Sequence, residues 1–170
     1  SAVWVKNMGL DAFEYSFGRG VLMSEEKALS IGKAFSENNV KISVHAPYYI
    51  NFSNPDPEMI DKSIGYVIKS AEMVGLMGGN RIIIHPATQG KDARENAFAR
   101  ALDNFKKLTD VIYATGMDNL LYCPETMGKT MQIGTYEEII NLCTLNKHLV
   151  PTFDFGHINA LEQGSLKSKD

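Results

Sequence analysis

The sequence predicts an α/β protein of the parallel-barrel type: about five β/α units of an eight-fold TIM barrel, and therefore an incomplete one. Short apolar strands alternate with amphipathic helices over a repeat of about 40 residues. No strand is followed by a glycine-rich GxGxxG or GxxxxGK turn, so the phosphate loops of an open nucleotide-binding sheet are missing. A complete barrel typically needs about 250 residues, whereas this chain has 170.

The first half of the chain contains two predicted strands, each followed by a helix. LDAFEYSF at 10–17 is expected to be a buried strand, and the helix after it begins near Ser24, whose hydroxyl can cap the first amides. KISVHAP at 41–47 is the second strand. The turn at 54–57 is followed by a long helix with an apolar stripe, and this helix is expected to end at Gly78 and Gly79.

The second half repeats this pattern. RIIIHPA at 81–87 is apolar up to its histidine, and the helix that follows ends at Gly116. NLLYCPE at 119–125 is the next strand, and a capping box starting at Thr135 opens the next helix. LVPTFDFGH at 149–157 is predicted to be the last strand.

Composition places the chain among ordinary single domains. Hydrophobic residues make up 44% and charged residues 22%, without a linker-like shift, so residues 1–170 are expected to form one partial barrel domain. The net charge of -3 gives no general nucleic-acid footprint, so any contact with phosphates must be local. Cys123 and Cys143 form no CxxC pair and predict a reducing compartment, the cytoplasm by default. No apolar run reaches the roughly 18 residues of a membrane span.

Both ends of the sequence are expected to be cuts in a longer barrel. The chain begins at Ser1 without a methionine, and it stops at Asp170, where a further element is due. An incomplete barrel leaves strand edges unpaired, which favours self-association.

Five residues of metal-ligand type fall at the ends of four successive predicted strands: His45, His85, Glu125, Asp154 and His157. Because parallel strands end at one common rim, we expect these side chains to converge. Imidazole and carboxylate ligands suit zinc or another divalent cation that activates a hydrolytic water. Glutamate can also bridge two cations through its two oxygens.

Each of these residues also has a structural interpretation when taken alone. His45 or His85 can be a hydrogen-bonded structural histidine, and Glu125 or Asp154 can cap the next turn or helix. Structural caps have no reason to recur as His, His, Glu and Asp on consecutive strand ends, so a metal site is preferred. Gly156 permits a turn that would aim the side chains on either side of it into one cavity. His148 precedes its strand, and a surface role is expected for it.

Loops at the same rim offer candidates for substrate contact. Tyr48, Asn51 and Asn54 lie just beyond the second strand, where an aromatic ring and amides can touch a substrate; packing of the loop on its own helix is the alternative. Arg19, between two glycines, occupies the corresponding loop after the first strand, with an ordinary solvated arginine as the alternative.

The motifs resemble those of the endonuclease IV family of apurinic/apyrimidinic endonucleases, within the xylose-isomerase-like barrels. The matching stretches are SVHAPYYIN, IIIHPA, PETMGK with QIGT, and FDFGHINA, in family order between residues 10 and about 165. The resemblance implies a zinc-dependent hydrolase of DNA base-excision repair. Its substrate would be damaged double-stranded DNA, cut 5′ to an abasic site.

The resemblance also implies roles for single residues. His45 and His85 would hold the first of three zinc ions, and Glu125, the catalytic carboxylate, would bridge to the second. Asp154 would bind that second ion, and His157 would contribute to the third. Manganese is an alternative ion.

Three loop residues would contact DNA by the same resemblance. Tyr48 matches the tyrosine of the family's H-x-x-Y-x-I-N loop, which includes Asn51, and Arg19 matches a family loop residue that enters the duplex. Later family motifs, which supply further histidine, aspartate and glutamate ligands, are missing, so the chain retains ligands for about one complete ion.

Two other functions remain open from the sequence. A metal-dependent sugar isomerase or epimerase of the same superfamily also uses strand-end His, Glu and Asp. A truncated, non-catalytic fragment would bind at most one zinc and associate through exposed edge strands.

Overall fold

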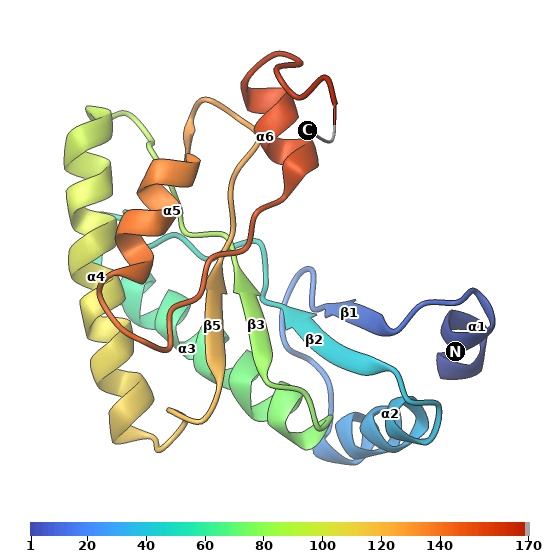
Figure 1. Ribbon diagram of the computed structural model, residues 1–170. Helices are drawn as coiled ribbons and strands as arrows, with labels where there is room; N and C mark the ends of the chain where they lie inside the picture. Colours follow the sequence, from blue (N-terminus) through green and yellow to red (C-terminus); the bar gives the residue numbers. More distant parts are fainter. Residues whose placement is uncertain (169–170) are drawn as a thin grey trace.

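The parallel sheet is the centre of the molecule (Figure 1). The computed structural model describes residues 1–168. Four strands pair in parallel in the order β1-β2-β3-β5: β1 (Ala12–Ser16), β2 (Lys41–His45), β3 (Arg81–Ile84) and β5 (Leu121–Pro124). Two short strands, β4 (Ala87–Thr88) and β6 (Gln132–Ile133), pair antiparallel beyond the carboxyl ends of that sheet.

The helices that lie between strands in the sequence cover one face of the sheet, as the barrel pattern predicts (Figure 1). The helices are α1 (Ala2–Asn7), α2 (Glu25–Glu37), α3 (Pro57–Leu76), α4 (Arg94–Ala114), α5 (Tyr136–Cys143) and α6 (Phe155–Leu161), of which α1 lies beside the β1 edge and α6 beyond the carboxyl ends of the strands. Helix α3 packs on β2 and β3, and α5 packs on β5. No helix within residues 1–168 has the length and apolarity that crossing a bilayer requires.

The predicted helix ends are confirmed. The Ser24 hydroxyl accepts the Lys27 amide at the start of α2, and Thr135 and Glu138 form the reciprocal capping box of α5. Gly78 and Gly116 adopt positive φ just beyond α3 and α4, a conformation that costs glycine little.

Strand register divides the sheet into two faces. Val44, Ile82 and Tyr122 are in register and join the helix-covered core. His45 is in register with Ile83, one residue further along, and therefore lies on the opposite face, which corresponds to the interior of a barrel. Side chains from neighbouring strands thus meet on this inner face.

The prediction of a buried first strand is wrong. Residues of β1 alternate between exposed and half-buried, and Leu10, just before the strand, is 50% exposed. β1 is the outer strand of the sheet and pairs only with β2 among the described residues. Phe13 and Tyr15 pack on the core from one side, while Glu14 faces the open inner side.

The prediction of a regular strand over 149–157 is also wrong. Two isolated parallel bridges, rather than a continuous ladder, join this segment to β5 and the residue after it: Tyr122 with Leu149 and Glu125 with Thr152. Pro124 has no N–H, so the hydrogen bond to the carbonyl of residue 150 that would connect the two bridges cannot form. The chain then turns into α6 at Phe155.

The expected surface role of His148 is not what the structure has. Its ring lies edge-on to Tyr113, with 5.8 Å between ring centroids, and its Nε2 is buried without a hydrogen-bond partner among the described residues.

Close packing at the amino end of the sheet is expected to depend on Gly32. A Cβ there would lie 2.6 Å from the carbonyl oxygen of Met77, whereas a Cβ at Gly65, on the exposed face of α3, would meet nothing within 4 Å. Gly32→Ala should therefore lower the free energy of unfolding by about 1–3 kcal/mol. Gly65→Ala should raise it by about 0.5–1 kcal/mol. Urea unfolding of both variants tests this, and equal effects would contradict the packing described.

Candidate metal centre

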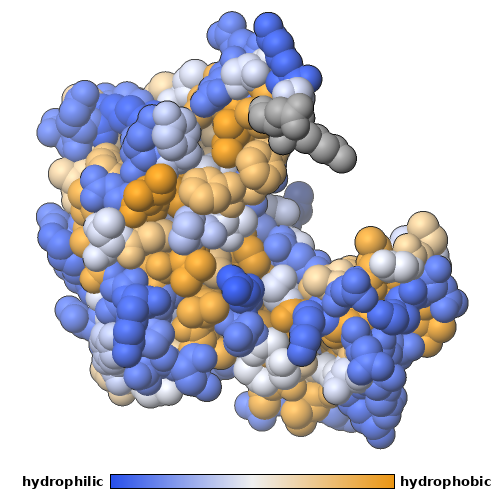
Figure 2. All heavy atoms as spheres, in the orientation of Figure 1, coloured by the Kyte–Doolittle hydropathy of each residue, from blue (hydrophilic) through white to orange (hydrophobic). Residues whose placement is uncertain are grey.

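Four segments bring ligand-type side chains to the carboxyl rim of the sheet. His45 ends β2, while His85 and Glu125 directly follow β3 and β5. Asp154 and His157 come from the start of α6. Figure 2, in the orientation of Figure 1, shows the molecule hollowed between the part that carries α6 and the part that carries β1 and α1.

His45, His85 and Glu125 form the first ligand group. The Glu125 Oε2 lies 3.4 Å from Nε2 of His45 and 3.1 Å from Nε2 of His85. The two imidazole rings meet edge-on with centroids 4.6 Å apart. His45 is only 7% exposed and Glu125 8%, so the group is held inside the rim rather than on a mobile surface.

The orientation of His45 leaves one nitrogen directed at the centre of the group. Its Nδ1 lies 2.8 Å from the carbonyl oxygen of Ala46, an acceptor, so Nδ1 carries the proton and donates it. Nε2 then faces Glu125. A histidine that binds a metal through one ring nitrogen usually donates a hydrogen bond from the other nitrogen to a carbonyl or carboxylate, which fixes the orientation of the ring.

Electrostatics inside the group favour a positive charge between the side chains. Burial alone would raise the pKa of Glu125, but hydrogen bonds from His45 and His85 lower it to about 2. Burial would lower the pKa of His45, yet the hydrogen bonds to Glu125 and to the Ala46 carbonyl raise it. The carboxylate is therefore ionised, and a cation can take the place of the proton shared with the imidazoles.

Glu125, Asp154 and His157 form the second group. Asp154 caps α6 through Oδ1, which accepts the His157 amide at 2.8 Å, while Oδ2 lies 3.7 Å from His157 Nδ1. Nδ1 of His157 is 2.8 Å from the carbonyl oxygen of Thr126, so Nε2 is left free as a ligand. The capping interpretation of Asp154 is thus confirmed, and the same residue also takes part in the ligand group.

Helix geometry, rather than a glycine turn, brings these two side chains together. Gly156 lies within the first turn of α6 and has no positive φ. Asp154 and His157 are three residues apart at the helix start, where side chains lie on one face. Asp154 and His157 thus lie in one group, as expected, but the first turn of α6 places them there rather than a glycine conformation at Gly156.

The two groups share Glu125, and both fit divalent cations. Within each group the ligand atoms lie within 4.8 Å of one another. Neutral imidazole and carboxylate are ligands that zinc accepts. Among residues 1–168, these are the two sets of three histidine or carboxylate side chains that lie close enough together to hold one metal ion.

The predicted substrate-contact residues lie at the same rim, with different surroundings. The exposed Tyr48 has its ring centroid 5.4 Å from that of His45 and 5.5 Å from that of His85, and its hydroxyl is 3.3 Å from Ser16 Oγ. Arg19 is exposed in the loop after β1. Tyr48 thus covers the first ligand group from the solvent side.

The side chain of Asn51 is hydrogen-bonded both to its own loop and to β4. Its Nδ2 donates to Thr88 Oγ1 at 3.1 Å, and its Oδ1 accepts the amides of Ser53 and Thr88. Asn54 similarly accepts the Asp56 amide, just before α3. The Asn51 amide also donates to Ser63 Oγ in α3 at 3.2 Å, a contact of the kind expected if the loop packs on its own helix.

Two residues of the site were not singled out from the sequence. Thr126 follows Glu125 and contacts both Asp154 and His157, but a threonine after a strand carries no sequence signal for that role. Glu14 lies on the inner face of β1 in register with Ser43. Partial burial raises its pKa, and His45 acts in the opposite direction. The period-two alternation of β1 was the available signal for Glu14.

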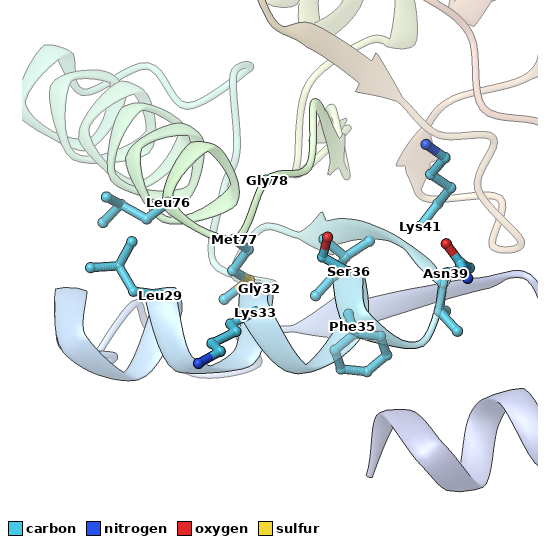
Figure 3. A pocket seen from close by; sticks show the side chains of 12 residues that line it. Leu29, Gly32, Lys33, Phe35, Ser36, Asn39, Lys41, Leu76, Met77 and Gly78 are labelled. Atoms are coloured by element: carbon cyan, nitrogen blue, oxygen red, sulfur yellow. The ribbon is translucent and has the colours of Figure 1, made fainter.

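A hollow of the surface lies away from this centre. It has a volume of about 440 Å³ and lies at the amino end of the sheet, between α2 and the end of α3 (Figure 3). Leu29 and Leu76 line it, and neither histidine nor carboxylate does. Active sites of parallel barrels lie at the opposite, carboxyl face, so this hollow carries no functional argument.

Comparison with known proteins identifies the family. The family model described as xylose isomerase-like TIM barrel matches residues 2–169, and the chain belongs to this family. Uncharacterized protein MJ0133 of Methanocaldococcus jannaschii is 33% identical over 162 residues, which are 95% of this chain and 58% of that protein. The "Probable endonuclease 4" of Acholeplasma laidlawii is 36% identical over 119 residues, 69% of this chain and 39% of that protein.

Solved structures share the fold. Endonuclease IV from Thermus thermophilus has a TM-score of 0.66 at 18% identity, over 96% of this chain and 65% of that one. D-Psicose 3-epimerase from Clostridium cellulolyticum has a TM-score of 0.75 at 16% identity, over 93% and 58%. The predicted fold class and the resemblance to endonuclease IV are thereby confirmed. The chain spans between 30% and 58% of the length of the curated relatives it matches.

The pH dependence of stability is expected to report on Glu125. Its pKa is lowered from an ordinary 4.5 to about 2, so its contribution is present above pH 4.5 and is lost as the pH falls through about 2. In the metal-free protein, wild type should exceed Glu125→Gln in free energy of unfolding by up to about 3 kcal/mol at pH 5. Urea unfolding between pH 5 and 2 should show that difference shrinking; a constant difference would contradict the pairing.

His85→Ala is expected to remove at least one equivalent of bound zinc, because it deletes one of the three ligands of the first group. His148→Ala serves as the matched control, since that ring packs on Tyr113 away from the rim. Metal analysis after dialysis against zinc compares the two variants with wild type. Unchanged zinc content in His85→Ala would exclude the first group as a cation site.

Proposed function

We propose that this protein is the metal-binding part of a phosphodiester hydrolase that incises DNA 5′ to abasic sites, as endonuclease IV does. Zinc is the proposed cation, with manganese as the alternative. Double-stranded DNA carrying an abasic site is the proposed partner.

One observation carries the proposal: two groups of ligand atoms share the buried carboxylate of Glu125. Sites that hold two cations a few ångströms apart are typical of enzymes that hydrolyse phosphate esters. Relatives with 30–36% identity named "Probable endonuclease 4" support the nuclease over other members of the fold. The likeness to sugar epimerases, at 13–18% identity, concerns the fold alone.

The residues divide the work between them. His45, His85, Glu125, Asp154 and His157 would hold the cations; bound cations supply charge neutralisation at the phosphate and a water of lowered pKa. The low pKa of Glu125 keeps it an anion, so it acts as a ligand and not as a proton donor. Tyr48, exposed beside both imidazoles, stands where a lesion would reach the rim.

The local character of this site accounts for DNA binding by a chain with net charge -3. His45, His85, Glu125, Asp154 and His157 would hold cations that neutralise phosphate locally, so a basic surface over the whole domain would not be required. Arg19, exposed on the loop after β1, adds a positive charge near the same rim.

Incision of a duplex with one abasic site, beside an undamaged duplex, tests the proposed function. The protein should be the longest translated reading frame that contains this chain, loaded with zinc and compared with its chelator-treated form. Zinc-dependent cleavage 5′ to the lesion supports the proposal. Conversion of a ketose such as D-psicose without incision would instead assign the protein to the epimerases of the fold.

Tyr48→Ala in the same protein should weaken binding to abasic DNA by about tenfold, because an aromatic contact with an unstacked nucleotide contributes about 1–3 kcal/mol. Bound zinc should stay unchanged, since Tyr48 is in neither ligand group. Tyr49→Ala is the matched control: Tyr49 is adjacent and equally exposed, at 58% against 56%. Undiminished affinity in Tyr48→Ala, or the same loss in both variants, would contradict the contact.

A further inference from the structure

Helix α6 is attached to the domain differently from the other helices of the rim. It contains no buried residue, whereas α5, on the neighbouring strand, buries Ile139 and Leu142. Apolar burial is the main source of helix stability in proteins, and a helix of seven residues is marginal by itself. Ile158 and Leu161 of α6 are only half-buried, so polar contacts contribute a large part of what holds the helix in place.

One residue, Thr126, provides most of these contacts. It is 1% exposed and directly follows the shared ligand Glu125. Its Oγ1 accepts the Asp154 amide at 2.8 Å, and its carbonyl oxygen accepts Nδ1–H of His157 at 2.8 Å. The Thr126 amide donates to the Thr152 carbonyl at 3.0 Å. This bond continues the pairing between β5 and residues 149–152, the segment that leads into α6.

The two ligand groups consequently differ in how rigidly the backbone holds their side chains. The first group comes from the ends of β2, β3 and β5, which are paired side by side in the parallel sheet. The second group takes two of its three ligands from α6 and its cap. Orientation of both ligands depends on the hydroxyl and the carbonyl of Thr126.

We propose that Thr126 is a positioning residue that assembles the second cation site, and that a cation bound there fastens α6 to the end of β5. The first group fills first because its ligands are already in place. The second cation binds with ordering of α6, so part of its binding free energy is spent on fixing the helix. This inference rests on the proposed function in one respect, that both groups hold cations.

Zinc titration of the metal-free protein tests the order of filling. Binding is followed by calorimetry with a competing chelator, and amide hydrogen exchange is followed over residues 155–161 at zero, one and two equivalents. Exchange in α6 should slow by at least tenfold on the second equivalent and change little on the first. Equal protection of α6 in the metal-free and the loaded protein would overturn the inference.

Three variants test the role of Thr126. Thr126→Val keeps the volume of the side chain and removes the hydroxyl, so the second equivalent should bind about 10–100-fold more weakly while the first stays within about threefold. Thr126→Ser restores the hydroxyl and should restore the second equivalent. Thr109→Val is the matched control, since Thr109 is also buried and its hydroxyl bonds the Lys106 carbonyl, within α4 and outside the site.

The outcomes separate this inference from the proposed function. If wild type binds no zinc, the cation site itself is refuted and the role of Thr126 falls with it. If zinc binds but Thr126→Val weakens both equivalents alike, has no effect, or behaves as Thr109→Val does, the proposed function stands and the inference is overturned.

Discussion

The buried carboxylate of Glu125 is the group on which the rim of this protein depends. It accepts hydrogen bonds from two imidazoles, belongs to both ligand groups, and is 8% exposed. A carboxylate without partners at that depth would be strongly disfavoured, so histidines or cations must compensate it. The two histidines do so within the sheet and lower its pKa to about 2. Glu125 is thereby fixed as an anion at the carboxyl rim, between the ends of β2 and β3 and the start of α6.

The parallel sheet brings these groups together, but it does so unevenly. Residues on paired strands have their positions determined by the hydrogen-bond register, which places His45 on the inner face. Beyond β5 the ladder is interrupted at Pro124 and continues only as far as the bond between the Thr126 amide and the Thr152 carbonyl, so Asp154 and His157 depend on contacts with Thr126. The first ligand group is therefore held by paired strands, whereas the second is held through Thr126. Barrel sites commonly combine strand ends with loops in this way.

Much of this arrangement was predictable from sequence, and the failures have physical causes. The strand-end positions of His45, His85 and Glu125 predicted their convergence, because parallel strands end at one rim. Capping boxes and terminal glycines predicted helix ends, because those signals are local. The burial of β1 was not predictable, since burial depends on which strands lie alongside. The start of α6 at Phe155 was missed because Asp154, its N-cap, was also interpreted as a ligand at the end of a strand. The contribution of Thr126 was missed because its contacts are with residues about 30 positions away in the sequence.

The most direct measurement of the central claim is a crystal structure of the zinc-loaded protein with anomalous scattering recorded on both sides of the zinc edge. Two zinc peaks are expected, both within about 2.0–2.2 Å of ligand oxygens or nitrogens. One peak would lie against His45, His85 and Glu125, and the other against Glu125, Asp154 and His157. Peaks located elsewhere, with the direct hydrogen bonds between Glu125 and the two histidines intact, would contradict it.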